Sequence, residues 1–260
     1  MNQKYALITG ASAGIGTYFA RCLAKKGYSL VLVARREDRL KQLATELKES
    51  YGAHSRIEVC DVSKVEECRN LMERLKDISL EVVINNAGFG ICGPFLDCSL
   101  TRELDMVDVN VKAVHVLMKL ALERMTAEQV KGYILNVASS AGLIPAGPYM
   151  ATYYATKAYV TSITQAVAQE LKEMGSDIYV GCLCPGPVDT EFNSVANVEF
   201  ALPGISAEFC ASYGIRKMFQ RKILIIPAWY MKGAMILGKF LPRKLYVSIT
   251  ARQQKKKISE

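Results

Sequence analysis

The opening of this 260-residue chain restricts its fold more than any other stretch. Residues 4–9 and 28–34 are short and apolar, which predicts two buried strands. Between them, a glycine-rich turn leads into a helical run that ends at Gly27. Strand, glycine-rich turn, helix and strand in this order are typical of a dinucleotide-binding fold. We therefore expect an α/β chain that forms a single doubly wound Rossmann-type domain over residues 1–260.

The turn supplies the features that a bound dinucleotide needs. Gly10 permits the tight turn, Gly14 lets the backbone approach a pyrophosphate, and Gly16 lets the helix pack closely. The N-terminus of the following helix favours the negative charge of the pyrophosphate. Ser12 and Ile15 lie in the same turn, and we assign all five residues to the cofactor site.

The same turn also has the spacing G-x-S-x-G around Ser12, which is the pattern of a serine hydrolase nucleophile. A hydrolase triad needs a histidine after the serine, usually late in the chain. The only histidines are His54, in a polar stretch between elements, and His115, inside a helical run. Their placement disfavours a hydrolase.

The end of the second strand indicates which nucleotide binds. An acidic residue there would bind the ribose hydroxyls of NAD, but Ala34 occupies the position and Arg35 and Arg36 follow. Because arginine pairs with a 2′-phosphate, the sequence favours NADP(H) over NAD(H), with Arg35 as the contact. Alternatively, the arginines only open a charged helix over residues 37–49, and we accept this interpretation for Arg39.

Two further turns follow predicted strands. Asp61 and Val62 follow the strand 56–60 and are expected beside the adenine, although Asp61 has an alternative role as N-cap of the helix 64–76. Asn86, Ala87 and Gly88 follow the strand 81–84, and their small or amide side chains allow the backbone to lie near the cofactor. An ordinary turn would use the same residues.

Tyr153 and Lys157 are four residues apart and share one face of a predicted helix. A phenol normally titrates near pH ~10, and an ammonium beside it favours the phenolate and lowers its pKa. The pair therefore suits an acid/base centre near neutral pH, and Ser139 can hydrogen-bond a substrate carbonyl oxygen. Alone, this spacing usually marks a solvated helix face.

The motifs together resemble the short-chain dehydrogenase/reductase family, in its single-domain branch, over about residues 4–190. They occur in the family's order: Thr9-Gly10-x-x-x-Gly14-Ile15-Gly16, Asn85-Asn86-Ala87-Gly88, Asn110, Asn136-x-x-Ser139, Tyr153-x-x-x-Lys157 and Pro185-Gly186-x-x-x-Thr190. The resemblance implies a largely parallel sheet of about seven strands, flanked by helices.

The resemblance also implies a role for each matched residue. Tyr153 is the general acid/base, and Lys157 lowers its pKa and binds the nicotinamide ribose. Ser139 orients the carbonyl or alcohol, and Asn110 holds a water in the proton relay. Contacts to the nicotinamide end come from a late turn: Pro185, Gly186 and Thr190.

The catalytic serine has two candidates. The family's usual serine-to-tyrosine spacing selects Ser140, whereas the upstream Asn-x-x-Ser spacing selects Ser139. We choose Ser139 and place a one-residue insertion between Gly142 and Tyr153.

Other stretches resemble the branch of the family with bulky apolar substrates, which includes hydroxysteroid dehydrogenases and long-chain 3-ketoacyl reductases. They are residues 86–90, 153–157 and 241–244. The implied activity is interconversion of a ketone and a secondary alcohol, on a small-molecule substrate that is steroid-like or long-chain acyl. The alternative from another class is a non-catalytic nucleotide-binding or membrane-surface module of the same fold.

Two long helices with apolar stripes are predicted, which could cover the sheet and also pair across a subunit interface. We therefore expect a homo-oligomer. The stripes are Leu104, Val107, Val111, Val114, Met118, Leu122 and Met125, and Val160, Ile163, Val167, Leu171 and Met174.

Charge and cysteine content narrow the setting. From Arg216 onward there are twelve Lys or Arg and one acid, Glu260, so the preceding residues are mildly acidic and we expect no nucleic-acid partner. Eight scattered cysteines suggest reduced thiols and a cytoplasmic location. Cys182 and Cys184 lack partner ligands, so no metal site is expected. We also expect no signal peptide.

Residues 191–215 are predicted to be loop-rich and form a candidate substrate lid, and residues 223–226 a last edge strand. Residues 223–260 form a basic, apolar extension, too interrupted by proline and lysine for a transmembrane helix. If 229–241 is helical, Lys232 and Lys239 lie on one edge, beside a broad apolar face.

That apolar face comprises Trp229, Ile236, Leu237 and Phe240. Such a helix suits docking over the substrate cleft or a partner subunit, which we favour, and it also suits peripheral contact with an anionic membrane.

Overall fold

The computed structural model describes residues 3–192, 204–238 and 240–255. Its centre is a seven-stranded sheet in the order β3-β2-β1-β4-β5-β6-β9, with every neighbouring pair parallel. The strands are β1 (Lys4–Thr9), β2 (Ser29–Ala34), β3 (Ser55–Val59), β4 (Ser79–Asn85), β5 (Tyr133–Val137), β6 (Tyr179–Leu183) and β9 (Leu224–Ile225). The predicted Rossmann-type sheet and its last edge strand are confirmed.

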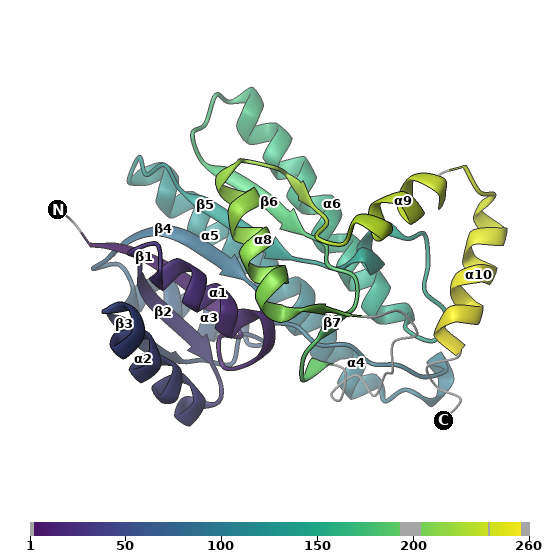
Figure 1. Cartoon of the computed structure of the whole chain (residues 1–260), viewed down its shortest axis with the longest axis horizontal. Helices are drawn as coiled ribbons and strands as arrows, with labels where there is room; N and C mark the ends of the chain where they lie inside the picture. The colour runs from purple at the N-terminus through teal and green to yellow at the C-terminus, as the bar shows by residue number, and fades with distance from the viewer. Residues whose placement is uncertain (1–2, 193–203, 239, 256–260) are drawn as a thin grey trace.

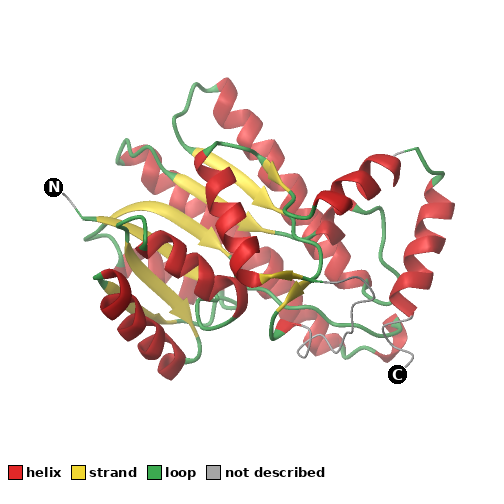
Figure 2. Ribbon diagram, viewed as in Figure 1, coloured by secondary structure: helices red, strands yellow, loops and turns green. Residues whose placement is uncertain are grey.

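Alternate residues of each strand enter two cores, because successive strand side chains point to opposite faces. In β1, Ala6 and Ile8 pack in one core, and Tyr5 and Leu7 pack in the other. The first core includes residues of α1 (Gly14–Ala24), α2 (Glu37–Tyr51) and α8 (Ala207–Phe219), and the second includes residues of α3 (Val65–Arg74), α5 (Val114–Ala127) and α6 (Ala151–Glu173). Helices thus cover both faces of the sheet (Figures 1 and 2).

The first predicted apolar stripe is wrong in its N-terminal half. The run consists of α4 (Leu100–Val107), the π-helical segment η2 (Asp108–Ala113) and α5. A π-helix has a wider turn than an α-helix, so it shifts the face that follows it. Met106 and Ala113 are buried as a result, whereas Leu104 is 54% exposed.

The loop-rich interpretation of residues 191–215 is also wrong in its second half, because α8 begins at Ala207. Ser206 caps this helix by accepting a hydrogen bond from the Phe209 N–H at 3.1 Å. Two short strands, β7 (Val188–Asp189) and β8 (Ile205–Ser206), pair beside it. The rest of the predicted lid lies largely within residues 193–203, outside the described residues.

The C-terminal extension forms α9 (Trp229–Gly238) and α10 (Arg243–Lys255). Both lie at the end of the molecule opposite the N-terminus, on the side toward which the strand arrows point (Figures 1 and 2). The predicted alignment of Lys232 with Lys239 cannot be compared, because Lys239 lies outside the described residues. The side chains of Trp229 and Ile236, which belong to the predicted apolar face, also lie outside the described part. Each helix in the described part of the chain falls short of the length or apolar content of a membrane span.

Candidate active site

A cavity of about 930 Å³ lies where the parallel strands end. Residues that follow six of the strands line it: Gly10, Arg35, Cys60, Asn86, Ala138 and Pro185. Open α/β sheets bind ligands at this edge because the turns there leave backbone groups free. All predicted site residues line the cavity except Gly16 and Asn110, which lie just behind its wall.

The glycine-rich turn has a backbone that other residues would strain. Gly10 and Gly14 have φ of +66° and +57°, in the left-handed region. A methyl group at Gly10 would lie 3.0 Å from the Ala87 Cα, and one at Gly16 would overlap the Gly10 carbonyl. The turn therefore brings bare backbone and the N-terminus of α1 to the cavity, which is a cradle that fits a pyrophosphate.

Thr9 ties this turn to the end of β4. Its Oγ1 accepts hydrogen bonds from the N–H groups of Asn86 and Ala87, both at 3.0 Å. The Asn86 side chain in turn donates to the Thr9 carbonyl at 2.9 Å. This pairing fixes the spacing of the two turns. Thr9 is therefore a positioning residue, a role that its place in the motif did not indicate.

The arginines after β2 are not equivalent. Arg36 donates to the Ser12 Oγ at 3.3 Å and to Glu191 at 3.1 Å, and Arg39 donates to Glu191 at 2.5 Å. The hydrogen bond from Arg39, followed by that from Arg36, holds the pKa of the Glu191 carboxyl below its usual value. Arg35 is exposed and lines the cavity. Of the arginines that follow β2, both Arg35 and Arg36 therefore line the cavity, rather than Arg35 alone.

Asp61 does not cap α3, because the residue before that helix is Lys64. Its Oδ1 accepts instead from the N–H and the hydroxyl of Ser63, at 3.1 and 2.8 Å. The N–H of Asp61 donates to Glu67 at 2.7 Å. These bonds hold Asp61 and Val62 in a turn that faces the cavity.

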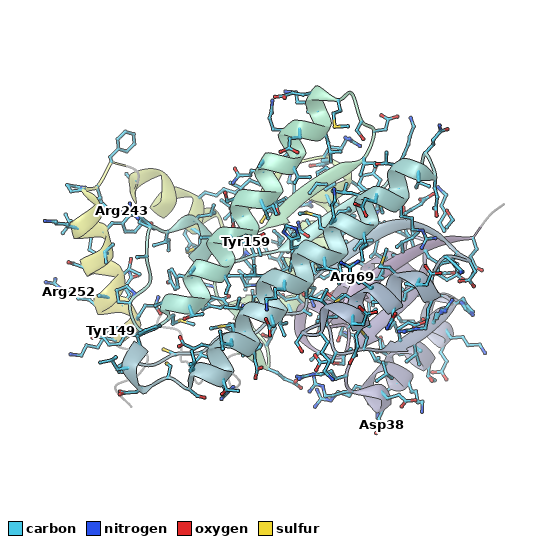
Figure 3. All side chains as sticks on the ribbon, turned by 180° about the vertical axis from the view of Figure 1, so that it is seen from behind. Asp38, Arg69, Tyr149, Tyr159, Arg243 and Arg252 are labelled. Atoms are coloured by element: carbon cyan, nitrogen blue, oxygen red, sulfur yellow. The ribbon has the colours of Figure 1, made fainter. Side chains whose placement is uncertain are left out.

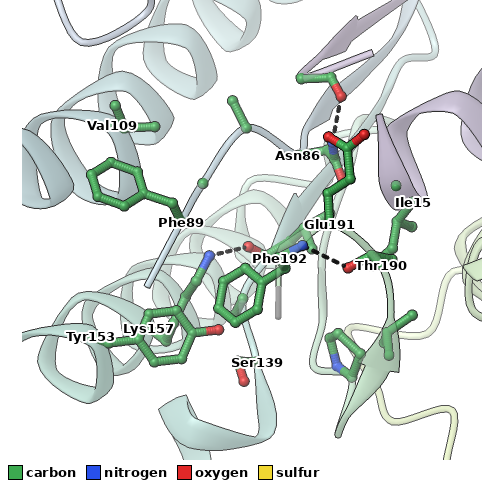
Figure 4. Close-up of a pocket in the computed structure, with 18 of the residues that line it drawn as sticks. Ile15, Asn86, Phe89, Val109, Ser139, Tyr153, Lys157, Thr190, Glu191 and Phe192 are labelled. Carbon is green, nitrogen blue, oxygen red and sulfur yellow. Dashed lines mark hydrogen bonds between the residues drawn. The ribbon is translucent and has the colours of Figure 1, made fainter. Parts of the chain in front are cut away.

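Tyr153, Lys157 and Ser139 meet at the opposite end of the cavity. Tyr153 and Lys157 lie in the first two turns of α6, and both are buried. The Tyr153 phenol lies beside the Ser139 hydroxyl, and the two point into the same space (Figure 4). Ser139 Oγ also accepts from the Ala141 N–H at 3.1 Å, which fixes its position. The geometry thus favours Ser139 over Ser140.

Burial dominates the titration of this group. It raises the pKa of Tyr153 to about 12, and the nearby Ser139 hydroxyl, which lowers that pKa, offsets only part of the effect. It also lowers the pKa of Lys157 to about 8. The expectation that Lys157 gives Tyr153 a low pKa is therefore wrong for this state of the chain. The Lys157 ammonium lies 5.8 Å from the centre of the Tyr153 ring and donates to the Val137 carbonyl at 3.0 Å.

Gly88 allows these groups to come together. A methyl group there would lie 2.9 Å from the Asn110 Oδ1 and 3.2 Å from the Lys157 Nζ. The Asn110 side chain is fully buried and bonds the backbone N–H and C=O of Phe89, at 3.1 and 2.9 Å, and the Thr156 hydroxyl. Its amide is therefore used by the chain itself, and the water-holding role of Asn110 stays a proposal.

Other residues of the cavity wall were not assigned individually from the sequence. Phe192 lies 5.6 Å from the Tyr153 ring, measured between ring centres. Tyr154 accepts a hydrogen bond from Gln254 of α10 at 2.6 Å, and Met231 of α9 lies against the Gly186 turn. Two of the residues lie in segments predicted near the substrate: Phe192 in the candidate lid 191–215, and Met231 in the helix 229–241 expected to dock over the cleft. The contact of Gln254 with Tyr154 joins residues far apart in sequence and had no such signal.

The structure gives the hydrolase interpretation no support. Among the described residues, no histidine lines the cavity that contains Ser12. His115 Nδ1 bonds the Tyr159 hydroxyl at 2.7 Å on the outer side of α5 and α6, and His54 packs against Tyr5. All eight cysteines are free thiols, and the described part of the chain has no cluster of three or more metal-ligating side chains.

Comparisons with known proteins agree with this geometry. The sequence profile of the family described as short chain dehydrogenase matches residues 4–199. The chain is 32% identical to the very-long-chain 3-oxoacyl-CoA reductase of Anas platyrhynchos over 204 residues, which are 76% of this chain and 64% of that protein. It is 35% identical to dehydrogenase/reductase SDR family member 11 of Gallus gallus over 195 residues, 73% of this chain and 76% of that protein.

Among solved structures, the fold is similar to that of a short-chain dehydrogenase from Sphingobium yanoikuyae in complex with NADPH. The TM-score is 0.80 at 28% identity, over 92% of this chain and 96% of that one. The chain spans between about half and two thirds of the length of the first curated relatives, at 53% to 64%.

Proposed function

Because the chain belongs to the short-chain dehydrogenase family, we propose that it is an NADP(H)-dependent oxidoreductase that interconverts a ketone and a secondary alcohol. The observation that carries the proposal is the meeting of Tyr153, Ser139 and Lys157 at one end of a cavity whose other end fits a dinucleotide. The relatives named above are a 3-oxoacyl-CoA reductase and a dehydrogenase/reductase by name, which supports an oxidoreductase.

The residues that would hold the cofactor follow the cavity wall. The turn around Gly14 and the N-terminus of α1 take the pyrophosphate, and Asp61 and Val62 face the adenine. Lys157 binds the nicotinamide ribose, and Pro185, Gly186 and Thr190 bound the nicotinamide end. When bound there, the cofactor supplies the hydride.

Proton transfer is the task of Tyr153. With its pKa near 12, the phenol is protonated at neutral pH and so begins ketone reduction as a proton donor. Ser139 hydrogen-bonds the same substrate oxygen and orients it. The charge on Lys157 favours the negative charge that Tyr153 gains as its proton leaves.

Selection of NADP(H) is assigned to the arginines after β2. A guanidinium at the cavity wall pairs with a 2′-phosphate through charge-assisted hydrogen bonds. Arg35 is the first choice because Arg36 and Arg39 already bond Glu191.

The substrate in this proposal is bulky and apolar, either steroid-like or long-chain acyl. Its support is the apolar wall beyond Tyr153, which consists of Phe89, Ile144, Met150, Phe192 and Met231. The 3-oxoacyl-CoA reductase among the relatives acts on long chains by name, which agrees with such a wall.

The test measures loss of NADPH and of NADH absorbance with a panel of bulky and small ketones. We expect turnover with NADPH and bulky ketones, and its loss by at least ~100-fold in Tyr153→Phe with NADPH affinity retained. Lys157→Ala should lower both activity and affinity. Near-normal activity of Tyr153→Phe contradicts the mechanism. NADPH binding without any turnover would identify the non-catalytic module instead.

Assembly and location complete the proposal. We propose a homo-oligomer, supported by the exposed or half-buried apolar residues Tyr159, Ile163 and Val167 on α6 and Met174 at its C-cap. A light-scattering mass of one 28.7 kDa chain at micromolar concentration would contradict it. The cytoplasmic location stays a prediction, and so does peripheral contact with an anionic membrane.

A further inference from the structure

The hairpin of α9 and α10 has an unusual outer end. Four apolar side chains around its turn are exposed, and we call them the hairpin tip: Leu237, Phe240, Leu241 and Leu245. Phe240 is 84% exposed and Leu237 70%. Single exposed apolar residues are common on soluble proteins, but a cluster with an aromatic side chain at a projecting turn indicates a contact surface.

The inner side of the same hairpin is already occupied. Met231 of α9 lines the cavity, and the Gln254 side chain of α10 is buried and donates to the Tyr154 hydroxyl at 2.6 Å. Tyr246 packs against Gly238, where a methyl group would lie 2.8 Å from its hydroxyl oxygen. The hairpin therefore docks over the cavity with one side and presents the tip on the other.

Charge around the tip has one sign. The sequence has no Asp or Glu between Glu208 and Glu260. Exposed basic residues lie on both helices: Arg243 and Lys244 beside the tip, and Lys232, Arg252 and Lys255 farther from it. Arg243 and Arg252 lie along the outer side of α10, at the edge of the molecule (Figure 3).

A second apolar surface provides a contrast. The 3-10 turn η1 (Phe95–Asp97) and α4 expose Phe95, Leu96, Leu100 and Leu104, and Leu96 is 94% exposed. Asp97 and Asp105 lie among them, with Arg102 as an exposed basic residue of the same helix, so this surface is slightly acidic where the hairpin tip is basic. Similar apolar exposure thus occurs with opposite charge, and charge decides which surface suits an anionic partner.

We propose that the hairpin tip docks on an anionic lipid bilayer. Phe240 and the leucines enter the interface between headgroups and acyl chains, and Arg243 and Lys244 lie at the level of the acidic headgroups. A second copy of the chain is the poorer occupant, because a symmetric contact would bring two basic tips together. The proposal does not depend on catalysis.

The experiment is co-sedimentation of the full chain with phosphatidylcholine vesicles, with and without phosphatidylglycerol, at low and physiological salt. We expect binding only to the anionic vesicles, weaker at the higher salt. Phe240→Ser should lower the partition coefficient about tenfold, and Arg243→Gln with Lys244→Gln roughly ten- to thirtyfold. Leu96→Ser is the matched control and should leave binding unchanged. Thermal unfolding of each variant checks that it is folded.

Several results would overturn the proposal. The protein could remain in the supernatant under every condition, or Leu96→Ser could weaken binding as much as Phe240→Ser does. Self-association that Phe240→Ser abolishes, without vesicle binding, would assign the tip to a second copy of the chain. Because none of these measurements depends on turnover, the results are independent of any failure to find a ketone substrate.

Discussion

The two ends of the cavity are built from different parts of the chain. Backbone forms the nucleotide end, where the turns after β1 and β4 interlock through Thr9 and Asn86. Side chains form the substrate end, and they come from α6, α9, α10 and the segment after β6. The nucleotide end therefore depends on local sequence, whereas the substrate end depends on packing between distant segments.

This difference separates the expected effects of mutation. Changes at the nucleotide end should alter cofactor affinity with little effect on substrate choice, since backbone there meets a constant ligand. Changes at the substrate end should alter turnover. Lys157 and Glu191 contact both ends of the cavity, so variants at these positions test whether effects on cofactor affinity and on turnover can be separated.

The largest effect is expected at the substrate end, from Ser139→Ala. Loss of the hydroxyl that lies beside Tyr153 and would orient the substrate oxygen should lower kcat by about 100-fold or more, with NADPH affinity retained. Ser140→Ala is the matched control, because Ser140 is the other candidate in the sequence. Steady-state kinetics on both variants decides between them, and the reverse ranking would show that the adjacent serine is the catalytic one.

At the nucleotide end, Arg35→Ala should weaken NADPH binding and leave NADH binding nearly unchanged. A charge-assisted hydrogen bond contributes roughly 1.5–3 kcal/mol, which corresponds to about ten- to a hundredfold in Kd. Fluorescence titration with both cofactors measures it, and Arg36→Ala is the comparison. Equal losses for NADPH and NADH would show that Arg35 is only structural. A larger NADPH loss in Arg36→Ala would move the phosphate contact to that residue.

Lys157 gives a smaller effect that is visible without any ligand. Its pKa falls from 10.5 to about 8 on folding, so between those pH values the unfolded chain binds more protons. Its contribution to the free energy of unfolding therefore rises as pH increases from about 8 to 10. Lys157→Met lacks this contribution, and the difference between the two proteins should change by roughly 1–3 kcal/mol over that range. Urea unfolding at several pH values measures it, and parallel pH profiles would contradict the shift.

The same division explains what the sequence could predict. Glycines, an amide and a Tyr-x-x-x-Lys spacing specify local geometry, so the parallel sheet and the residues around the nucleotide end were accessible. The π-helical segment around Asn110 was not, because it conserves the apolar composition of an α-helix and changes only its register. The contact of Gln254 with Tyr154 joins residues 100 positions apart, and no local pattern encodes it.

Titration also depends on the folded environment. The Tyr153 and Lys157 spacing correctly predicted that the two side chains share a face of α6, but spacing does not report burial. Desolvation raises the pKa of the phenol and lowers that of the amine, and it is the largest cause of both shifts.

The smallest effect is expected from Glu191, which follows Thr190 at the substrate end and bonds Arg36 and Arg39 at the nucleotide end. All three side chains are about half exposed, so these ion pairs should add little to stability. The carboxylate nevertheless competes with a 2′-phosphate for Arg36. Glu191→Gln removes its charge and keeps its shape, so NADPH should bind about two- to fivefold more tightly, with NADH unchanged. Titration with both cofactors at low salt measures the change. Weaker NADPH binding would show instead that Glu191 holds the arginines in position for the phosphate.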